Sequence, residues 1–398
     1  MSYLVTFRCV QCNTPYSADR WQQECSCGGT LFAEYDIEKI RVCVQPSAIP
    51  DRPRNIWRYH ELLPVPDSMA ITLGEGCTPL LHLRKTGKFL GISELFIKDE
   101  GRNPTGTFKD RGAAVGITAA RSFGVRDISV PTTGSAGISW AAYGAAAGVR
   151  VHVSMPKGLP VFERICRMYG ADLELYAGDF SKEGGACHEE ALKRGWASGA
   201  TLREPYRLEG KKTLLYELAE DFGWRVPDVV LCPTGGGIQV VAIWKAYQEL
   251  LTLGWVAKKP LRLVSVQAAG VAPIVKAWEA RQETVERWPK ITTKVLGFMA
   301  SKPKGGPLVL RALAESDGTA IAIEDQSMFE MVAHIARDEG LYISAEGAAA
   351  IVATAELRKS GFIQPDDQVV AINTGAGLRS MGYPKRRELS RGGHSQSS

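Results

Sequence analysis

Three apolar runs in this chain each end in a glycine-rich turn, and each turn opens a helical pattern. The three segments are residues 128–137, 229–237 and 369–377. Turns of this kind present free backbone N–H groups and a helix N-terminus at the carboxyl edge of a parallel sheet, where anionic ligands bind. A single such turn is common for packing reasons alone. Three in one chain predict a ligand that is held at several points.

From about residue 95 onward, short apolar runs alternate with helical stretches. We expect strands at 127–130, 149–155, 171–176, 228–232, 261–266 and 368–372, and helices at 136–147, 160–169, 211–222, 238–250, 326–339 and 345–360. Strands that alternate with helices indicate βαβ units and parallel sheets. The 398 residues are enough for two such domains. The sequence therefore predicts an α/β fold with two open parallel-sheet domains.

Four cysteines near the N-terminus form two closely spaced pairs. Cys9 and Cys12 are followed by Cys25 and Cys27, a pattern similar to the two knuckles of a zinc ribbon, in which four thiolates surround Zn²⁺. Because residues 1–40 are too few to bury a core, a metal would stabilise this segment directly. The second pair has one spacer residue instead of two, so reduced cysteines in a small flap are the alternative.

Lys109 stands at the start of a helical run in the segment Asn-Pro-Thr-Gly-Thr-Phe-Lys-Asp-Arg-Gly, residues 103–112. The segment is no phosphate-binding P-loop, because Thr107 occupies the position where that motif needs lysine. The turn at 375–377 lacks the third glycine of a dinucleotide-binding motif. A helix N-terminus disfavours an ammonium group, and a ligand pocket would add desolvation, so Lys109 could act as a nucleophile and base. The alternative is a surface lysine in a Lys-Asp-Arg charge cluster.

Residues 103–112 closely resemble the lysine motif of the fold type II enzymes that use pyridoxal 5′-phosphate (PLP). The pattern N-P-T-G-S-F-K-D-R-G of the threonine synthase family differs only at Thr107. Two more segments are similar to that family: residues 73–80 match L-G-E-G-x-T-P-L, and residues 207–213 match R-x-E-G-x-K-T. The resemblance extends from about residue 5 to about residue 382, with the motifs in the family's order. Many chains like threonine synthase also carry an N-terminal cysteine cluster.

The resemblance implies a PLP site between two open parallel-sheet domains. Lys109 would bind the cofactor covalently, Phe108 would pack beside its ring, and Thr374 would hydrogen-bond the ring nitrogen. The residues that would hold the PLP phosphate through backbone amides are Gly235, Gly236, Gly237 and Ile238. The residues that would cradle the substrate α-carboxylate are Thr133, Gly134, Ser135, Ala136 and Gly137. Glu346 would lie near the ring, or would cap the helix that it begins.

Two segments depart from the family pattern. Ser135 stands where the family carries an asparagine that reaches the 3′-oxygen of PLP, and it also belongs to the expected cofactor contacts. The shorter serine would lose that contact, move it or make it through water. Residues 297–305 resemble only loosely the G-L-R-V-P stretch of the family. Both differences fall where substrate or cofactor contacts are expected, so they bear on which reaction is catalysed.

The leading interpretation is a PLP-dependent lyase of the threonine synthase type, which converts O-phospho-L-homoserine and water into L-threonine and phosphate with Lys109 as the catalytic residue. The substrate phosphate needs a cationic pocket, for which the candidates are Arg164, Lys157, Lys302 and Lys304. The alternatives are a hydroxyamino-acid dehydratase or a β-replacement synthase on the same scaffold. A more remote alternative is a non-catalytic PLP-binding regulatory protein.

Charge and hydropathy argue against other classes of partner. The net charge of +5 is small for this length, and no basic stripe is interleaved with aromatic residues, so we expect no nucleic-acid partner. No apolar run approaches 18 residues, so we expect no membrane-spanning helix. The start of the chain lacks the apolar core of a signal peptide. We therefore expect a cytoplasmic enzyme with reduced cysteines, and the resemblance implies a homodimer that acts on a small amino acid.

These patterns divide the chain into four parts. Residues 1–40 form the zinc-ribbon-like segment, and residues 41–115 together with 205–384 form a large PLP-binding domain. Residues 116–204 form a smaller, mobile α/β domain between the two parts of the large one. Residues 385–398 are polar, and we expect this tail to be disordered.

Overall fold

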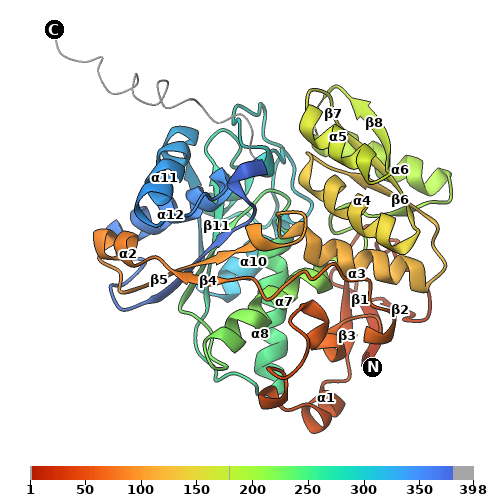
Figure 1. The fold of residues 1–398 in the computed structure, drawn as a ribbon, viewed down its shortest axis with the longest axis horizontal. Coiled ribbons are helices and arrows are strands. Elements are labelled where there is room, and N and C mark those ends of the chain that lie inside the picture. The colour runs from red at the N-terminus through yellow and green to blue at the C-terminus, as the bar shows by residue number, and fades with distance from the viewer. Residues whose placement is uncertain (1, 179, 380–398) are drawn as a thin grey trace.

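The computed structural model describes residues 2–178 and 180–379, so the tail expected at 385–398 lies outside the described residues. The described chain forms three sheets with helices packed around them (Figure 1). Among these residues, no helix has both the length and the apolar character needed to span a bilayer. The α/β class predicted from the sequence is confirmed.

The largest sheet has six strands in the order β12-β11-β10-β13-β5-β4. They are β4 (Leu80–His82), β5 (Glu94–Asp99), β10 (Val229–Pro233), β11 (Arg262–Ala268), β12 (Thr319–Ile323) and β13 (Gln368–Asn373). All neighbours pair in parallel except β4, which lies antiparallel to β5. The expectation of a purely parallel sheet is wrong at this edge, because the short link at 83–93 does not provide a crossover of the usual length.

Helices cover both faces of this sheet, so its central strands are buried on both sides. In β10, for example, Val230 and Cys232 pack into one core cluster, while Val229 and Leu231 pack into another. The helices that belong to this part of the molecule are α2 (Arg84–Leu90), α7 (Tyr206–Asp221), α8 (Ile238–Leu253), α9 (Pro273–Glu279), α10 (Gly306–Glu315), α11 (Asp325–Asp338) and α12 (Ala345–Lys359).

Helix α7 begins five residues before the expected start at 211. The difference lies at Gly210, which interrupts the helical pattern in the sequence. In the structure Gly210 is a contact point between helices, since a Cβ built on it would lie only 1.9 Å from the carbonyl oxygen of Arg111. Arg111 belongs to α3 (Lys109–Ser122). Glycine therefore lets α7 pack closely against α3.

A second, four-stranded parallel sheet forms the smaller lobe, in the order β8-β7-β6-β9. Its strands are β6 (Asp127–Pro131), β7 (Arg150–Pro156), β8 (Asp172–Tyr176) and β9 (Ala197–Ser198). Its helices are α4 (Ser135–Ala147), α5 (Pro160–Met168) and α6 (Phe180–Lys193). In Figure 1 this yellow-green lobe stands beside the rest of the molecule. All of these elements fall inside the interval 116–204, whose boundaries and mobility remain predictions.

The N-terminal segment forms a small antiparallel sheet, β2-β1-β3, with strands β1 (Leu4–Cys9), β2 (Pro15–Tyr16) and β3 (Leu31–Tyr35), followed by α1 (Ile37–Cys43). It packs on the start of α7 through aromatic rings. Tyr206 stacks on Trp21 with 4.6 Å between ring centroids and meets the edge of Phe7 at 5.4 Å. The segment is therefore joined to the body of the enzyme by buried apolar contacts.

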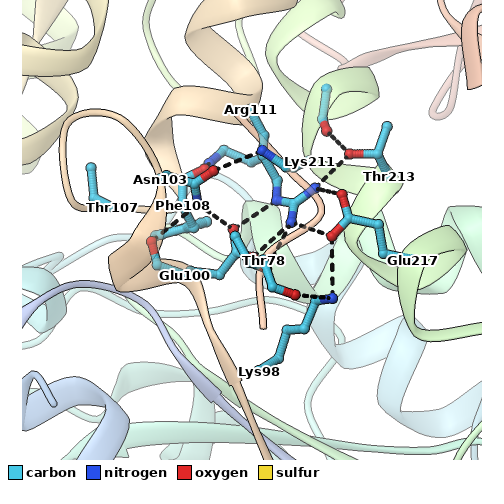
Figure 2. A network of polar contacts seen from close by, with 12 residues as sticks. Thr78, Lys98, Glu100, Asn103, Thr107, Phe108, Arg111, Lys211, Thr213 and Glu217 are labelled. Carbon is cyan, nitrogen blue, oxygen red and sulfur yellow. Dashed lines mark hydrogen bonds and ion pairs between the residues drawn. The ribbon is translucent and has the colours of Figure 1, made fainter. Parts of the chain in front are cut away.

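A fully buried arginine joins three elements of the large domain (Figure 2). Arg111 donates to Glu100, with 2.7 Å between Nε and Oε2, and to Glu217, with 2.6 Å between Nη1 and Oε1. Glu100 lies in the short turn after β5, and Glu217 lies on α7. Lys98 of β5 adds a contact to Glu217 at 3.2 Å. Each buried charge thus has an opposite charge beside it, as burial in a medium of low dielectric constant requires.

Asp110 does not pair with its neighbour Arg111. Its carboxylate accepts hydrogen bonds from the Thr105 amide at 2.7 Å and from the Thr105 hydroxyl at 2.5 Å. It thereby fixes the turn that precedes α3. Burial raises the pKa of this carboxyl group, although these hydrogen bonds act in the opposite direction.

Replacing Arg111 by leucine should strongly destabilise the protein, because it leaves the carboxylates of Glu100 and Glu217 buried without their main partner. Loss of one partner of a buried ion pair costs about 3–5 kcal/mol. The control is Arg8→Leu, which removes a 2.7 Å pair with Glu34 whose side chains are 35% and 42% exposed, and which should cost less than about 1 kcal/mol. Urea unfolding of both variants measures the difference. Equal losses would contradict the central role of Arg111.

Candidate active site

A cavity of about 670 Å³ lies at the carboxyl edges of both parallel sheets. All three glycine-rich turns predicted to bind a ligand contribute to its wall, as does the start of α3. The wall includes Lys109, Ser135, Gly235 and Thr374, which come from segments far apart in the sequence. The structure thus brings together the loops that the sequence could only identify one by one.

Lys109 is the first residue of α3, and it lines this cavity. Its Nζ lies 4.1 Å from the centroid of the Phe108 ring. Burial lowers the pKa of the Lys109 amine to about 8; the charge of Arg207 acts in the same direction, Glu346 opposes it, and Arg379 adds to it. At this pKa a useful fraction of the amine is neutral near physiological pH, as a nucleophile or general base needs.

The turn at Gly235–Gly237 has the shape of a phosphate cradle. A Cβ on Gly235 would lie 2.3 Å from the carbonyl oxygen of Gly297, and one on Gly237 would lie 2.8 Å from Cγ2 of Val309. Gly237 has a φ of +90° and caps α8 without any side-chain hydrogen bond to the first-turn amides. Those amides are therefore suited to bind the phosphate of PLP.

Thr374 lies at the end of β13 and lines the cavity. Its carbonyl oxygen accepts hydrogen bonds of 3.1 Å from the Phe108 amide and from the Thr107 hydroxyl. These bonds tie the segment before Lys109 to the neighbouring strand. The two residues expected at the ring, Phe108 and Thr374, are therefore held together, so this part of the site also fits PLP.

The turn at 133–137 only partly matches its expected role as a cradle for the substrate carboxylate. Thr133, Ser135 and Ala136 line the cavity. The amides of Gly134 and Gly137 instead donate to the hydroxyl of Thr132, at 2.9 and 3.3 Å. The amide donors of these two glycines are therefore already used within the turn, and the carboxylate-binding role of Thr133, Ser135 and Ala136 stays a prediction.

Glu346 lines the cavity at the start of α12. It does not act as the N-cap of that helix, because Ser344 is the N-cap and accepts from the Gly347 amide. Instead, Oε1 of Glu346 accepts a hydrogen bond of 3.0 Å from the Gly297 amide. It thereby positions the loop at 297–305, the second segment that departs from the family pattern.

The cations expected to bind a substrate phosphate fall into two groups. Arg164 and Lys157 are exposed and do not belong to the cavity wall, so these two expectations are wrong. Arg164 lies on the exposed side of α5, whereas Cys166 is the buried residue of that helix. Lys302 and Lys304 do line the cavity, and Lys304 also pairs with Glu24.

Further cationic side chains that the sequence did not single out line the cavity, among them Arg207, Lys211 and Arg379. Arg207 is 4% exposed; its Nη1 donates to the Thr201 hydroxyl at 2.8 Å, while its Nη2 has no partner among the described residues. Neither terminal nitrogen of Arg379 has such a partner either. The motif at 207–213 specified Arg207 and contained the signal for that residue only.

The four cysteines of the N-terminal segment come together as predicted, with all sulfur atoms within 4.8 Å of one another. The Sγ atoms of Cys9 and Cys27 are 3.5 Å apart, and those of Cys12 and Cys25 are 3.4 Å apart. Four thiolates at about 2.3 Å from a tetrahedral Zn²⁺ would be separated by about 3.8 Å. The donor set and its dimensions therefore fit a metal, and Gly29 leaves room for it, since a Cβ there would lie 2.5 Å from the Cys9 sulfur.

Solved structures with this fold include several PLP enzymes. A threonine deaminase from Solanum lycopersicum superposes with a TM-score of 0.66 and 18% identity, over 79% of this chain and 87% of that one. A diaminopropionate ammonia lyase from Escherichia coli superposes with a TM-score of 0.67 and 18% identity, over 81% and 89%. At this level of identity they show that the fold is shared, as the resemblance to fold type II enzymes implied.

Comparison of sequences is more specific. Threonine synthase of Methanocaldococcus jannaschii is 35% identical over 94% of this chain and 92% of its own length. Threonine synthase of Methanosarcina acetivorans is 32% identical over 92% and 90%. Residues 71–375 match the family described as pyridoxal-phosphate dependent enzymes. The chain therefore belongs to the family of pyridoxal-phosphate dependent enzymes and, within it, is related to the threonine synthases.

Proposed function

We propose that this protein is a threonine synthase, which converts O-phospho-L-homoserine and water into L-threonine and phosphate. The observation that carries the proposal is Arg207, a buried guanidinium group that lines the same cavity as Lys109 and has an unpaired nitrogen. The Gly235–Gly237 turn already suits the cofactor phosphate, and the turn at 133–137 suits a carboxylate. Arg207 therefore suits a further anionic group, and a phosphorylated substrate has one.

The cofactor, when bound, supplies a conjugated ring that stabilises negative charge at the substrate carbon atoms. Lys109 would hold it at the start of α3, and Thr374 would offer the ring nitrogen a neutral hydroxyl group. Once the substrate amine has displaced it, the Lys109 amine can remove the proton at Cα and then one at Cβ. After phosphate has left Cγ, the same amine can return one proton to Cγ; it can then take a proton from the water that adds at Cβ and return one to Cα. Each such transfer by a positioned base contributes about 10²–10⁴-fold.

Ser135 favours a second candidate function, elimination to a 2-oxoacid by a hydroxyamino-acid dehydratase or replacement by a β-replacement synthase. The serine lines the cavity where the threonine synthase pattern has asparagine. Neutral hydroxyamino acids carry no second anion, so neither of these alternatives uses the unpaired nitrogen of Arg207. The two functions differ in whether phosphate is released along with the amino-acid product.

We also infer that Cys9, Cys12, Cys25 and Cys27 bind a structural Zn²⁺. The support is the four sulfur atoms within 4.8 Å of one another and the small size of the sheet that they flank. A cytoplasmic location and a homodimer remain predictions, drawn from the reduced cysteines and from the family resemblance.

A panel of amino acids tests the proposed reaction. With O-phospho-L-homoserine, the PLP-loaded enzyme should release threonine and phosphate in equal amounts, whereas serine and threonine should give little 2-oxoacid. Lys109→Ala should lower the rate by at least about 10³-fold, because one base serves several transfers. Borohydride should fix the cofactor to the peptide that contains Lys109. Label on any other lysine, or 2-oxoacid as the main product, would contradict the assignment.

Substitution of Ser135 should change the outcome of the reaction and leave cofactor binding intact. The side chain can replace the asparagine contact with one neutral hydrogen bond at most, worth about 0.5–1.5 kcal/mol. Ser135→Ala should therefore slow turnover by no more than about tenfold, and Ser135→Asn should shift the ratio of threonine to 2-oxoacid. Product analysis measures both. A Ser135→Ala variant as inactive as Lys109→Ala would mean that Ser135 itself transfers a proton.

Removal of zinc should lower stability more than it changes the chemistry. Metal analysis should find about one zinc per chain, as expected for four thiolate ligands. Cys12→Ser should lower the melting temperature, while Cys43→Ser, which removes an exposed cysteine outside the cluster, should not. If chelated and metal-loaded proteins melt at the same temperature, the inference of a structural zinc is wrong.

A further inference from the structure

Lys211 is a second lysine that lines the active-site cavity. Figure 2 shows its hydrogen bond to Phe108. It lies on α7 and is only 2% exposed. Its Nζ donates to the Phe108 carbonyl oxygen at 3.4 Å and lies 3.7 Å from the centroid of the Phe108 ring. The Nζ of Lys109 lies 4.1 Å from the same centroid. Both amines therefore contact the Phe108 ring. The motif R-x-E-G-x-K-T does not specify the residue at position 211.

The other buried lysines of this domain show how an ammonium group is normally accommodated here. Lys98, Lys212 and Lys245 each form ion pairs with two carboxylates. Lys211 forms no ion pair within residues 2–178 and 180–379. A charged ammonium at this position would therefore be a buried charge without an opposite partner, which costs several kcal/mol.

The charged groups around Lys211 act in both directions. Lys109 and Arg111 on α3 and Arg207 on α7 disfavour its protonation, whereas the carboxylates of Glu100 and Glu204 favour it. Glu100 is already engaged by Arg111, at 2.7 Å. Burial raises the pKa of Glu204 to about 7, although the charge of Arg207 opposes this shift. Burial above all, followed by the charges of Lys109 and Arg207, places the pKa of Lys211 well below its ordinary value.

Arg207 lies one helical turn before Lys211, and the two side chains run side by side. Both pass over Gly112 of α3, where a Cβ would lie 2.9 Å from Cγ of Arg207 and 3.2 Å from Cε of Lys211. An anion bound to the unpaired Nη2 of Arg207 would therefore lie close to the Lys211 amine. Its negative charge would offset the repulsion between Arg207 and a protonated Lys211, and would favour protonation of the amine.

We propose that Arg207 and Lys211 form a proton-linked anion site, in which Lys211 is uncharged until a dianionic group binds and then takes up one proton from solvent. The group that fits is the phosphate ester of an amino-acid side chain, so the inference extends the proposed function. Lys211 would act as a specificity residue, because a neutral hydroxyamino acid would leave the amine uncharged and the site unfilled.

Sulfate is the suitable probe, because this dianion does not titrate near neutral pH and any proton taken up belongs to the protein. The experiment uses PLP-loaded enzyme, in which the cofactor occupies the Gly235–Gly237 turn and Lys109. Calorimetry in buffers with different ionisation enthalpies counts the protons taken up per sulfate. We expect uptake of up to one proton, and an affinity that falls by up to tenfold per pH unit as pH rises from the pKa of the free site to that of the occupied one.

Two variants identify the residue responsible. Lys211→Met keeps the apolar stem and removes no ion pair, so it should fold, bind sulfate more weakly and show no proton uptake. Lys211→Arg keeps a permanent charge and should bind sulfate with no uptake and no pH dependence. Melting curves confirm that both variants are folded.

Sulfate binding without proton uptake in the unmodified enzyme would overturn the proposal, as would uptake that persists in Lys211→Met, or no sulfate binding at pH 7. This test does not depend on turnover. Proton-linked sulfate binding in an enzyme that makes no threonine from phosphohomoserine would support the anion site and would overturn only the proposed reaction.

Discussion

The buried charge of Arg111 sets the geometry on which the active site depends. It lies two residues after Lys109 and pairs with Glu100, in the turn after β5, and with Glu217, on α7. Because all three groups are excluded from water, none of them can move without leaving a charge unpaired. The start of α3 is therefore fixed relative to a strand of the large sheet and to a second helix. The position of the Lys109 amine is a consequence of this arrangement.

Helix α7 carries two kinds of charge on two faces. Glu209, Lys212 and Glu217 pair inside the large domain with partners on α3, β5 and α8. Arg207 and Lys211 line the cavity instead. Among the described residues Lys211 has no ion pair, and Arg207, whose Nε lies 3.7 Å from the carboxylate of Glu204, leaves its Nη2 without a hydrogen-bond partner. Glycines at positions 112 and 210 allow α3 and α7 to approach closely enough for both faces to make these contacts. Helix α7 thus pairs the charges of one face within the large domain and keeps cationic groups available on the face that lines the cavity.

The sequence could predict what depends on local chemistry. Glycine-rich turns after apolar runs identified the loops around the cavity, and the resemblance of residues 103–112 to a family motif identified the Lys109 amine, because both signals lie within about ten consecutive residues. The cationic side chains that line the cavity could not be found from such local patterns. Arg164 and Lys157 were candidates for binding the substrate phosphate but do not line the cavity. Arg379, near the end of the described chain, does line it. Which cation faces the cavity is decided by packing between helices that are distant in sequence, such as the close contact between Gly210 of α7 and Arg111 of α3.

The N-terminal segment connects the cysteine cluster to residues that line the same cavity. Glu24, next to Cys25, pairs with Arg203 and Lys304, which both line the cavity, and with His188 of α6 at 3.2 Å. Lys304 also donates to the carbonyl oxygen of Gly28 at 2.9 Å. One carboxylate therefore links the cysteine-rich turn to a helix of the small lobe and to the loop at 297–305. Metal binding at four thiolates can order a small segment, so the proposed metal at this cluster would hold Glu24 in place and, through it, its partners Arg203, His188 and Lys304.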